Sequence, residues 1–198
     1  MRLNWIVVVV VSVMLSLAAC NSTAPAPAAQ TGTGAQAPKA GDSFAQLATY
    51  EDPNKKFRID APASWRAQPQ KLVQDNMKAA TAFVGPEGFI SVTQFDFGSV
   101  PAEPASVLVD SFLQVTGVRS YKNFKELARL PESNQTVWVE MEYLNGENRP
   151  IHNLTQLRID GSRISLIAVN FDQSAWPRAV EISKQIIKSY VLLDNKSG

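Results

Sequence analysis

The chain of 198 residues has one cysteine and one histidine, and its 19 basic side chains nearly balance 18 acidic ones. One cysteine cannot form a disulfide within the chain, so core packing has to stabilise the fold. A nearly neutral protein has no electrostatic reason to bind nucleic acid. The sequence also lacks the spacings of zinc-protease, serine-hydrolase, C-x-x-C, P-loop and EF-hand motifs. We therefore expect that the protein is not an enzyme and that it has no cofactor, metal site or nucleic-acid partner.

The N-terminal apolar run is too short to span a membrane. It extends from Trp5 to Leu17, contains two serines and follows the positive charge of Arg2. At about 1.5 Å per residue a helix of this length reaches about 20 Å, less than the ~30 Å hydrocarbon core of a bilayer. This organisation is typical of a secretory signal peptide, which we predict at residues 1–19.

The apolar run ends in Leu17-Ala18-Ala19-Cys20, which resembles the bacterial lipobox. The resemblance implies that a diacylglyceryl group is attached to the Cys20 thiol, that the chain is cut before Cys20 and that the new amine is often acylated. Two or three acyl chains hold a protein stably on a membrane, whereas one does not. We therefore expect a lipoprotein outside the cytoplasm, with the cell membrane or the outer membrane as its partner through Cys20.

After the lipobox the composition changes twice. Residues 20–42 are almost all Ala, Pro, Thr, Gln, Gly and Ser, which bury too little apolar surface to offset the entropy of ordering. We predict that they form a disordered linker. Residues 43–198 are mixed and apolar, with aromatic side chains throughout, and this length suits one domain that buries roughly 70% of its unfolded surface.

Hydrophobic patterns predict two long helices in this domain, at residues 101–117 and 175–190, and a third, short helix at 72–80. In the first, Gly117 is expected to adopt the left-handed conformation at the helix end. Period-two patterns predict the strands. These are 45–50, 57–61, 81–84, 89–97, 124–130, 135–143, 151–159 and 163–171.

The last four strands are separated only by short turns. Parallel neighbours would need crossovers of a dozen or more residues, so this spacing predicts an antiparallel meander. In residues 163–171 apolar side chains occupy both alternating faces. That strand should therefore be central, with a layer of structure on each face of the sheet.

Parts of the domain resemble the PsbP and Mog1-like family. The sequences YED at 50–52 and FRIDAPASW at 57–65 are similar to its opening pattern Y-x-D…F-x-x-x-x-P-x-x-W, although Lys56 stands where that family usually has glycine. The sequence IKSY at 187–190 is similar to the end of its closing helix. The resemblance implies an α+β fold, an α/β/α sandwich around a mainly antiparallel sheet. It also implies an accessory module for assembly, stability or binding.

Glu140 and Glu142 are the best candidate acid pair. They share a strand face with Trp138, and side chains two residues apart on a strand are about 6.5–7 Å apart, within the range for inverting glycosidases. The alternate positions are apolar, however, so a solvated face is the preferred interpretation, and a carbohydrate or peptide groove on Trp138 is an alternative. His152 is expected to be a surface or hydrogen-bonded residue rather than a catalytic base.

Arg119, Lys122, Lys125 and Arg129 form a modest basic cluster that Glu126 interrupts. Solvated charge on a loop and an edge strand is the preferred interpretation. Contact with lipid headgroups or an acidic partner is the alternative. The predicted interaction surface consists of Arg119, Lys122 and Lys125 together with the glutamate pair and Trp138.

Three functions remain open from the sequence. The leading hypothesis is a lipid-anchored, non-catalytic binding or assembly module next to an envelope protein complex. The second is a carrier or sensor for a small apolar ligand, which requires an enclosed cavity of several hundred cubic ångströms between sheet and helix. The third is an envelope hydrolase, which requires His152, Glu140 or Glu142 to lie in a cleft with second carboxylate or hydroxyl partners.

Overall fold

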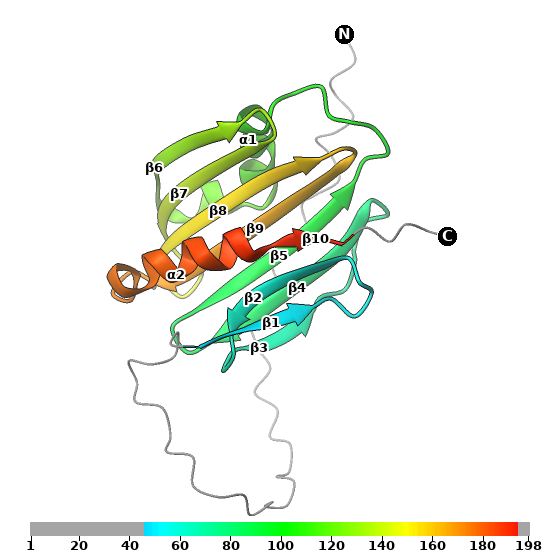
Figure 1. Cartoon of the computed structure of the whole chain (residues 1–198). Helices are drawn as coiled ribbons and strands as arrows, with labels where there is room; N and C mark the ends of the chain where they lie inside the picture. The colour runs from blue at the N-terminus through cyan, green and yellow to red at the C-terminus, as the bar shows by residue number, and fades with distance from the viewer. Residues whose placement is uncertain (1–45, 194–198) are drawn as a thin grey trace, which may run out of the picture.

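One long antiparallel sheet organises the structure. The computed structural model describes residues 46–193, and in them seven strands pair in the order β3-β4-β5-β9-β8-β7-β6 (Figure 1). Each neighbouring pair is antiparallel. The strands are β3 (Arg66–Pro69), β4 (Met77–Gly85), β5 (Gly88–Asp96), β6 (Lys122–Ser133), β7 (Thr136–Leu144), β8 (Pro150–Asp160) and β9 (Arg163–Asp172).

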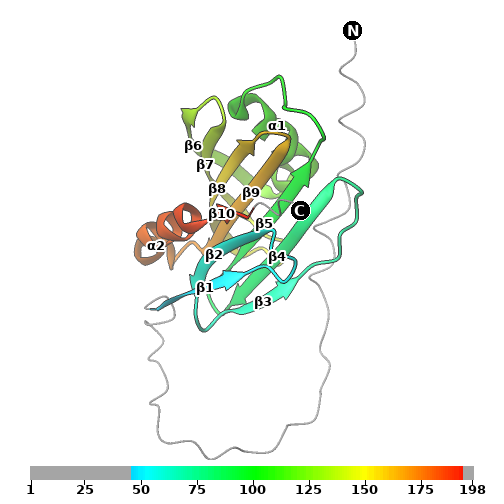
Figure 2. The ribbon, with the colours of Figure 1, turned by 45° about the vertical axis from the view of Figure 1, so that its right-hand side comes forward.

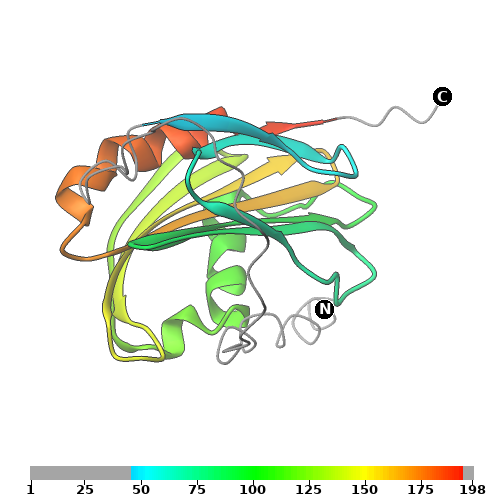
Figure 3. The ribbon, with the colours of Figure 1, turned by 90° about the horizontal axis from the view of Figure 1, so that it is seen from below.

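Each face of the sheet carries a further layer. On one face lie α2 (Trp176–Ser189) and a small sheet in the order β1-β2-β10, formed by β1 (Leu47–Glu51), β2 (Phe57–Pro62) and β10 (Val191–Leu192). On the other face lies α1 (Ala105–Val115), followed by the 3-10 helix η1 (Val118–Ser120). Figure 3 shows the three layers, and Figure 2 shows the small sheet beside α2. The expected α/β/α sandwich is confirmed.

The face under α2 and β2 is closed by apolar packing. Phe57 and Ile59 of β2, Val169 and Phe171 of β9 and Ile186 of α2 belong to one cluster and are fully buried. Burial of a side chain of this size stabilises the fold by about 1.5–3 kcal/mol. This layer therefore makes a large contribution to the stability of a fold without a disulfide.

On the opposite face, α1 is too short to cover the sheet. Its 11 residues make a helix about 16 Å long and about 10–12 Å across, whereas seven strands spaced at about 4.8 Å are about 29 Å broad. The helix contacts β6, β7 and β8, where Val109 and Leu113 pack against Val139 and Leu157. The area over β5 and β9 lies beside the helix.

Two predictions about the sheet are confirmed. β6, β7, β8 and β9 are consecutive neighbours, as expected for a meander, and β9 is the fourth of the seven strands. β9 joins this meander to β5, with Gly88 opposite Phe171 and Asp96 opposite Arg163. The main sheet therefore consists of two groups of strands, β3 to β5 and β6 to β9, which meet at the β5 and β9 pair.

The prediction of a helix at residues 72–80 is wrong. No helix forms there, and β4 starts at Met77. Ala79 and Phe83 are buried on one face of this strand, and Met77 and Ala80 are buried on the other, with a break in register between Met77 and Ala79. A strand covered on both faces by small apolar residues loses its alternation, and the sequence alone cannot separate it from a helix. The short strands β3 and β10 were not predicted.

The ends of α1 differ slightly from the prediction. The helix starts after Pro104, which is its N-cap, and is shorter than the expected range 101–117. Gly117 has a φ of 71° just after the helix, so its predicted left-handed conformation is confirmed. Neither α1 nor α2 is long and apolar enough to cross a membrane, in the part of the chain that the structure describes. The predictions for residues 1–19, Cys20 and residues 20–42 lie outside the described residues.

Candidate functional site

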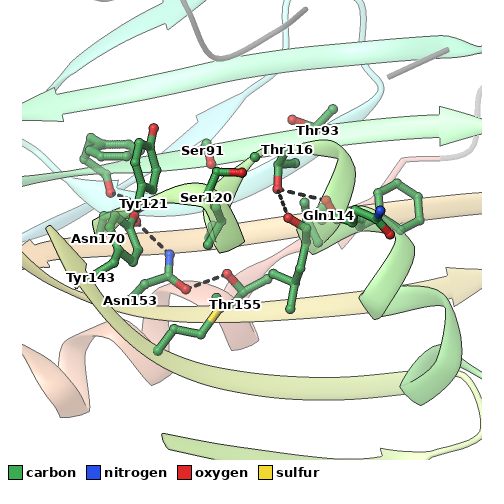
Figure 4. Close-up of a pocket in the computed structure, with 18 of the residues that line it drawn as sticks. Ser91, Thr93, Gln114, Thr116, Ser120, Tyr121, Tyr143, Asn153, Thr155 and Asn170 are labelled. Carbon is green, nitrogen blue, oxygen red and sulfur yellow. Dashed lines mark hydrogen bonds between the residues drawn. The ribbon is translucent and has the colours of Figure 1, made fainter. Parts of the chain in front are cut away.

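A pocket of about 460 Å³ lies on the α1 face of the sheet. Its floor is formed by β5, β7, β8 and β9, and residues 112–121, which end α1 and form η1, lie over it (Figure 4). This volume is within the range of about 300–1,000 Å³ that is common for small-molecule sites. The volume that the small-ligand hypothesis requires between sheet and helix is therefore present, but the pocket is partly open to solvent rather than enclosed.

Strand alternation brings polar side chains to the floor of the pocket. In β8, Asn153 and Thr155 line the pocket, whereas His152 belongs to the opposite face. The register places Asn170 of β9 opposite Asn153. Ser91 of β5 lies opposite Ala168, which is the next residue of β9 that lines the pocket. Polar residues from three neighbouring strands therefore meet in the middle of the sheet.

These side chains form a chain of hydrogen bonds. The Tyr143 hydroxyl and Nδ2 of Asn153 both donate to Oδ1 of Asn170, at 2.8 and 2.7 Å, and Thr155 Oγ1 donates to Oδ1 of Asn153 at 2.8 Å. Figure 4 shows the chain along the floor of the pocket. Asn153 and Thr155 are 3% exposed and Asn170 is 2% exposed. Polar groups buried this deeply lower stability unless they are paired, so the chain fixes the shape of the floor.

Aromatic rings form much of the pocket wall. Phe89 and Phe95 come from β5, Phe112 comes from α1, and Tyr121 follows η1. The ring of Tyr121 stacks on that of Tyr143, with centroids 5.0 Å apart and planes 16° apart. Burial raises the pKa of Tyr143 above its usual value, and Tyr121 adds a smaller effect in the same direction. The Tyr143 hydroxyl therefore remains protonated at neutral pH and can donate to Asn170.

The described side chains that line the pocket carry no formal charge. None of them is Asp, Glu, Lys, Arg, His or Cys, and their polar groups are hydroxyls and amides. Such groups can bind and orient a ligand by hydrogen bonds.

His152 and the two candidate glutamates meet on the opposite face of the sheet. Nε2 of His152 is 2.7 Å from Glu140 Oε1, and Nδ1 is 3.2 Å from Glu142 Oε1. The ring of Trp176 stacks on the imidazole, with centroids 4.0 Å apart. Both ring nitrogens face carboxylates, and only the protonated imidazole donates from both. His152 is 5% exposed, because the two glutamates and the ring of Trp176 surround its imidazole.

This arrangement corrects part of the prediction for the glutamates. Glu140 and Glu142 do not lie on a freely solvated face, because their side chains are 33% and 27% exposed and hold His152. The prediction that His152 is a hydrogen-bonded residue is confirmed. Among residues 46–193 no three His, Cys, Asp or Glu side chains are grouped so that they could hold a metal ion.

The basic cluster is divided between two parts of the molecule. Arg119 lies on the α1 side and forms an ion pair with Asp110 of α1. Arg129 of β6 also bonds to Asp110, with 2.7 Å between Nη2 and Oδ1, and so fastens the helix to the edge strand. The hydrogen bond from Arg129 is the main reason why the pKa of Asp110 is lowered.

The other members of the predicted interaction surface lie on the face that carries α2. Lys125 of β6 stands opposite Glu142, and Lys122 donates to the side chain of Asn148. Trp138 is half-buried, packs against the core under α2, and donates from Nε1 to Glu132 at 2.9 Å. The structure therefore brings these residues near the glutamate pair and leaves Arg119 apart.

Sequence reasoning missed the residues of the pocket floor. The signal was present as polar residues at alternate positions in strands that are otherwise apolar: Asn153 and Thr155 in β8, Ser91 and Thr93 in β5, and Asn170 in β9. In a central strand that is covered on both faces, such residues must find hydrogen-bond partners or a ligand.

The chain matches no protein-family model and no curated protein. Among solved structures it is similar to cyanobacterial PsbP (CyanoP) from Synechocystis sp. PCC 6803, with a TM-score of 0.55 and 14% identity, over 81% of this chain and 98% of that chain. The fold is PsbP-like. This confirms the fold that the sequence resemblance implied.

Two other solved structures align with the PsbP-like domain at lower scores. PA94 from Pseudomonas aeruginosa has a TM-score of 0.45 and 14% identity, over 75% of this chain and 99% of that chain. LpqN, which is involved in cell envelope biogenesis in Mycobacterium tuberculosis, has a TM-score of 0.47 and 9% identity, over 75% of this chain and 91% of that chain. At these identities the comparisons concern the fold and not an activity.

Proposed function

We propose that this protein is a lipid-anchored, non-catalytic binding module at the outer face of a bacterial membrane, and that it holds a small molecule in the pocket beside α1. The observation that carries the proposal is the pocket of about 460 Å³ with a polar floor and aromatic walls. A face that served only stability would be filled with apolar side chains. Here Asn153, Thr155 and Asn170 are kept almost fully buried instead.

The chemistry of the described residues supports binding rather than catalysis. The pocket is lined by hydroxyl, amide and apolar groups. The histidine that could act as a base is held between Glu140 and Glu142 and is covered by Trp176, on the other face of the sheet. A substrate in the pocket would be separated from that imidazole by the sheet itself.

The location and the partner in this proposal come from the sequence. The lipobox-like end of the apolar run would anchor Cys20, and a linker of the length of residues 20–42 would let the domain move about 25 Å from the bilayer. An envelope protein complex is the proposed partner. Trp138, Lys122 and Lys125, with the glutamate pair beside them, form its proposed contact surface.

The anchor is tested by isolating membranes from cells that produce the wild-type protein or the Cys20→Ala variant. We expect the wild type to sediment with membranes and to co-purify after crosslinking with an envelope complex, and both results to be lost or weakened in the variant. Equal amounts of both proteins in the membrane fraction would refute the anchor.

The pocket is tested with N-phenyl-1-naphthylamine, an uncharged dye whose fluorescence rises in apolar sites. Ser91→Phe fills the pocket from a half-buried strand position, whereas Ser111→Phe places the same ring on an exposed position of α1 that does not line the pocket. We expect dye binding at least tenfold weaker in Ser91→Phe and unchanged in Ser111→Phe. Equal binding by both variants would refute the proposed pocket.

A further inference from the structure

We infer that the ligand of this pocket is an uncharged, largely apolar molecule that presents an acceptor oxygen, of the carbonyl or ester type, to the amide groups of Asn153 and Asn170. The inference rests on the proposed function, because it assigns the chemical class of the ligand to the same pocket. Three properties of the pocket carry it: the absence of charge in its described lining, the unused hydrogen-bond donors on its floor, and its size.

The lining selects against ions. No described side chain in the wall or floor carries a formal charge that could pair with a charged ligand. An ion that leaves water for such a site loses its hydration without gaining a counter-charge, which is far more costly than burying a neutral polar group with a hydrogen bond. A carboxylate, a phosphate or an amine should therefore bind much more weakly than a neutral molecule of the same size.

The hydrogen bonds on the floor leave donors rather than acceptors. Oδ1 of Asn170 already accepts from Tyr143 and Asn153, and Oδ1 of Asn153 accepts from Thr155. Each amide nitrogen has two hydrogens. Asn153 Nδ2 uses one of them for Asn170, and Asn170 Nδ2 uses one for the backbone oxygen of Phe89 at 3.4 Å. The remaining N–H of each amide can bond to an acceptor oxygen of a ligand.

Two hydroxyls extend this donor surface. Ser91 and Thr93 of β5 are half-buried and line the same pocket (Figure 4). Away from the floor, the walls are the aromatic and aliphatic side chains of Phe89, Phe95 and Phe112 and their neighbours. A ligand with one polar end and an apolar body therefore matches the distribution of polar and apolar groups.

The volume limits the size of the buried part. At about 30 Å³ for each non-hydrogen atom, taken from the volume of a water molecule, a pocket of about 460 Å³ holds roughly fifteen such atoms. Medium-chain acyl esters and bicyclic aromatic ketones are both of this size. They share the chemistry of the inference, an apolar body with a carbonyl oxygen, and differ in whether the body is a flexible chain or a flat ring.

The test uses the full chain with Cys20→Ala, so that no attached acyl group competes for the pocket, and measures displacement of N-phenyl-1-naphthylamine at pH 8. Methyl decanoate is compared with decanoate, which has the same chain and a negative charge. 2-Methyl-1,4-naphthoquinone is compared with 2-methylnaphthalene, which lacks the carbonyl oxygens. We expect methyl decanoate to bind at least tenfold more tightly than decanoate, and the quinone about five- to tenfold more tightly than the hydrocarbon.

Variants test whether the acceptor oxygen of the ligand bonds to the amide of Asn153. Asn153→Leu should weaken binding of the preferred carbonyl compound about five- to tenfold and change binding of 2-methylnaphthalene less than twofold. If Asn153→Leu does not fold, Ser91→Ala, which should weaken the same compound at least twofold, is compared with Ser111→Ala, which should not change it. Decanoate that binds as tightly as its ester, or a hydrocarbon that binds as tightly as the quinone, would overturn the ligand class. Dye binding that Ser91→Phe leaves intact would instead overturn the proposed pocket itself.

Discussion

Replacing Asn170 by leucine should destabilise the fold by about 2–4 kcal/mol, although the two side chains have the same number of non-hydrogen atoms and the same branching. The substitution removes the oxygen that accepts from both Tyr143 and Asn153, which are 6% and 3% exposed. A buried donor without a partner costs about 1–3 kcal/mol, so the two together cost about 2–6 kcal/mol. Both donors border the pocket, where water can reach them, and leucine adds apolar burial, so the lower part of this range is expected.

Tyr143→Phe provides the comparison. It removes one donor but leaves Oδ1 of Asn170 bonded to Asn153, so no group is left unpaired, and a loss of about 1 kcal/mol is expected. In the double variant with Asn170→Leu the orphaned hydroxyl is absent. Its destabilisation should therefore be smaller than the sum of the two single changes by about 1 kcal/mol.

The assay is urea unfolding at pH 7 followed by tryptophan fluorescence, with the midpoint and the m-value fitted for each variant. Two results would refute the reasoning. One is a loss of less than about 1 kcal/mol in Asn170→Leu, which would show that water can replace Oδ1 of Asn170 as the acceptor for both donors. The other is strict additivity in the double variant, which would show that Tyr143 and Asn170 do not interact.

Three further predictions concern stability. Gly117→Ala should lower the free energy of unfolding by about 1–2 kcal/mol, because φ of Gly117 is 71°. Gly146 lies outside the left-handed region, so Gly146→Ala should change it by less than about 0.5 kcal/mol. Equal urea midpoints for the two variants would contradict this. Burial raises the pKa of Tyr143, so the folded state holds that proton more tightly than the unfolded state. The free energy of unfolding should therefore fall as the pH rises above about 10. In the Tyr143→Phe variant it should fall less between about pH 9 and 11.5. Because Arg129 lowers the pKa of Asp110, the stabilisation of the fold by the Asp110 carboxylate is present above about pH 4 and is lost as the pH falls further. As the Asp110 side chain is 45% exposed, Asp110→Asn should cost only about 0.5 kcal/mol at pH 7, and the difference should disappear near pH 2 or in 1 M salt.

The arrangement of the last four strands could be predicted from the sequence because their turns are short and their patterns regular. Alternating apolar residues on both faces of 163–171 placed β9 in the centre. The same physics misled the prediction at residues 72–80, because a strand buried on both faces and rich in alanine has no clear period. Local pattern therefore predicts an element well when only one kind of element fits it.

The candidate sites depend on long-range pairing, which local patterns do not contain. Glu140 and Glu142 could be found as a pair, but their contact with His152 follows from the register of β7 and β8. The pocket depends on Asn153 and Asn170 lying opposite each other, and on the short length of α1. Polar residues in central strands were the available signal, and their partners became visible only in three dimensions.

The pairing of β5 with β9 has a consequence for folding kinetics. It joins residues on the order of eighty positions apart, such as Gly88 and Phe171, whereas the other pairs of the main sheet join neighbours in the chain. The entropy of closing so long a loop makes this contact a candidate for the slow step of folding. The pocket lies across the same seam, since Ser91 belongs to β5 and Asn170 to β9. A bound molecule would therefore hold together the two groups of strands that are hardest to join, and its release would lower the free energy of unfolding.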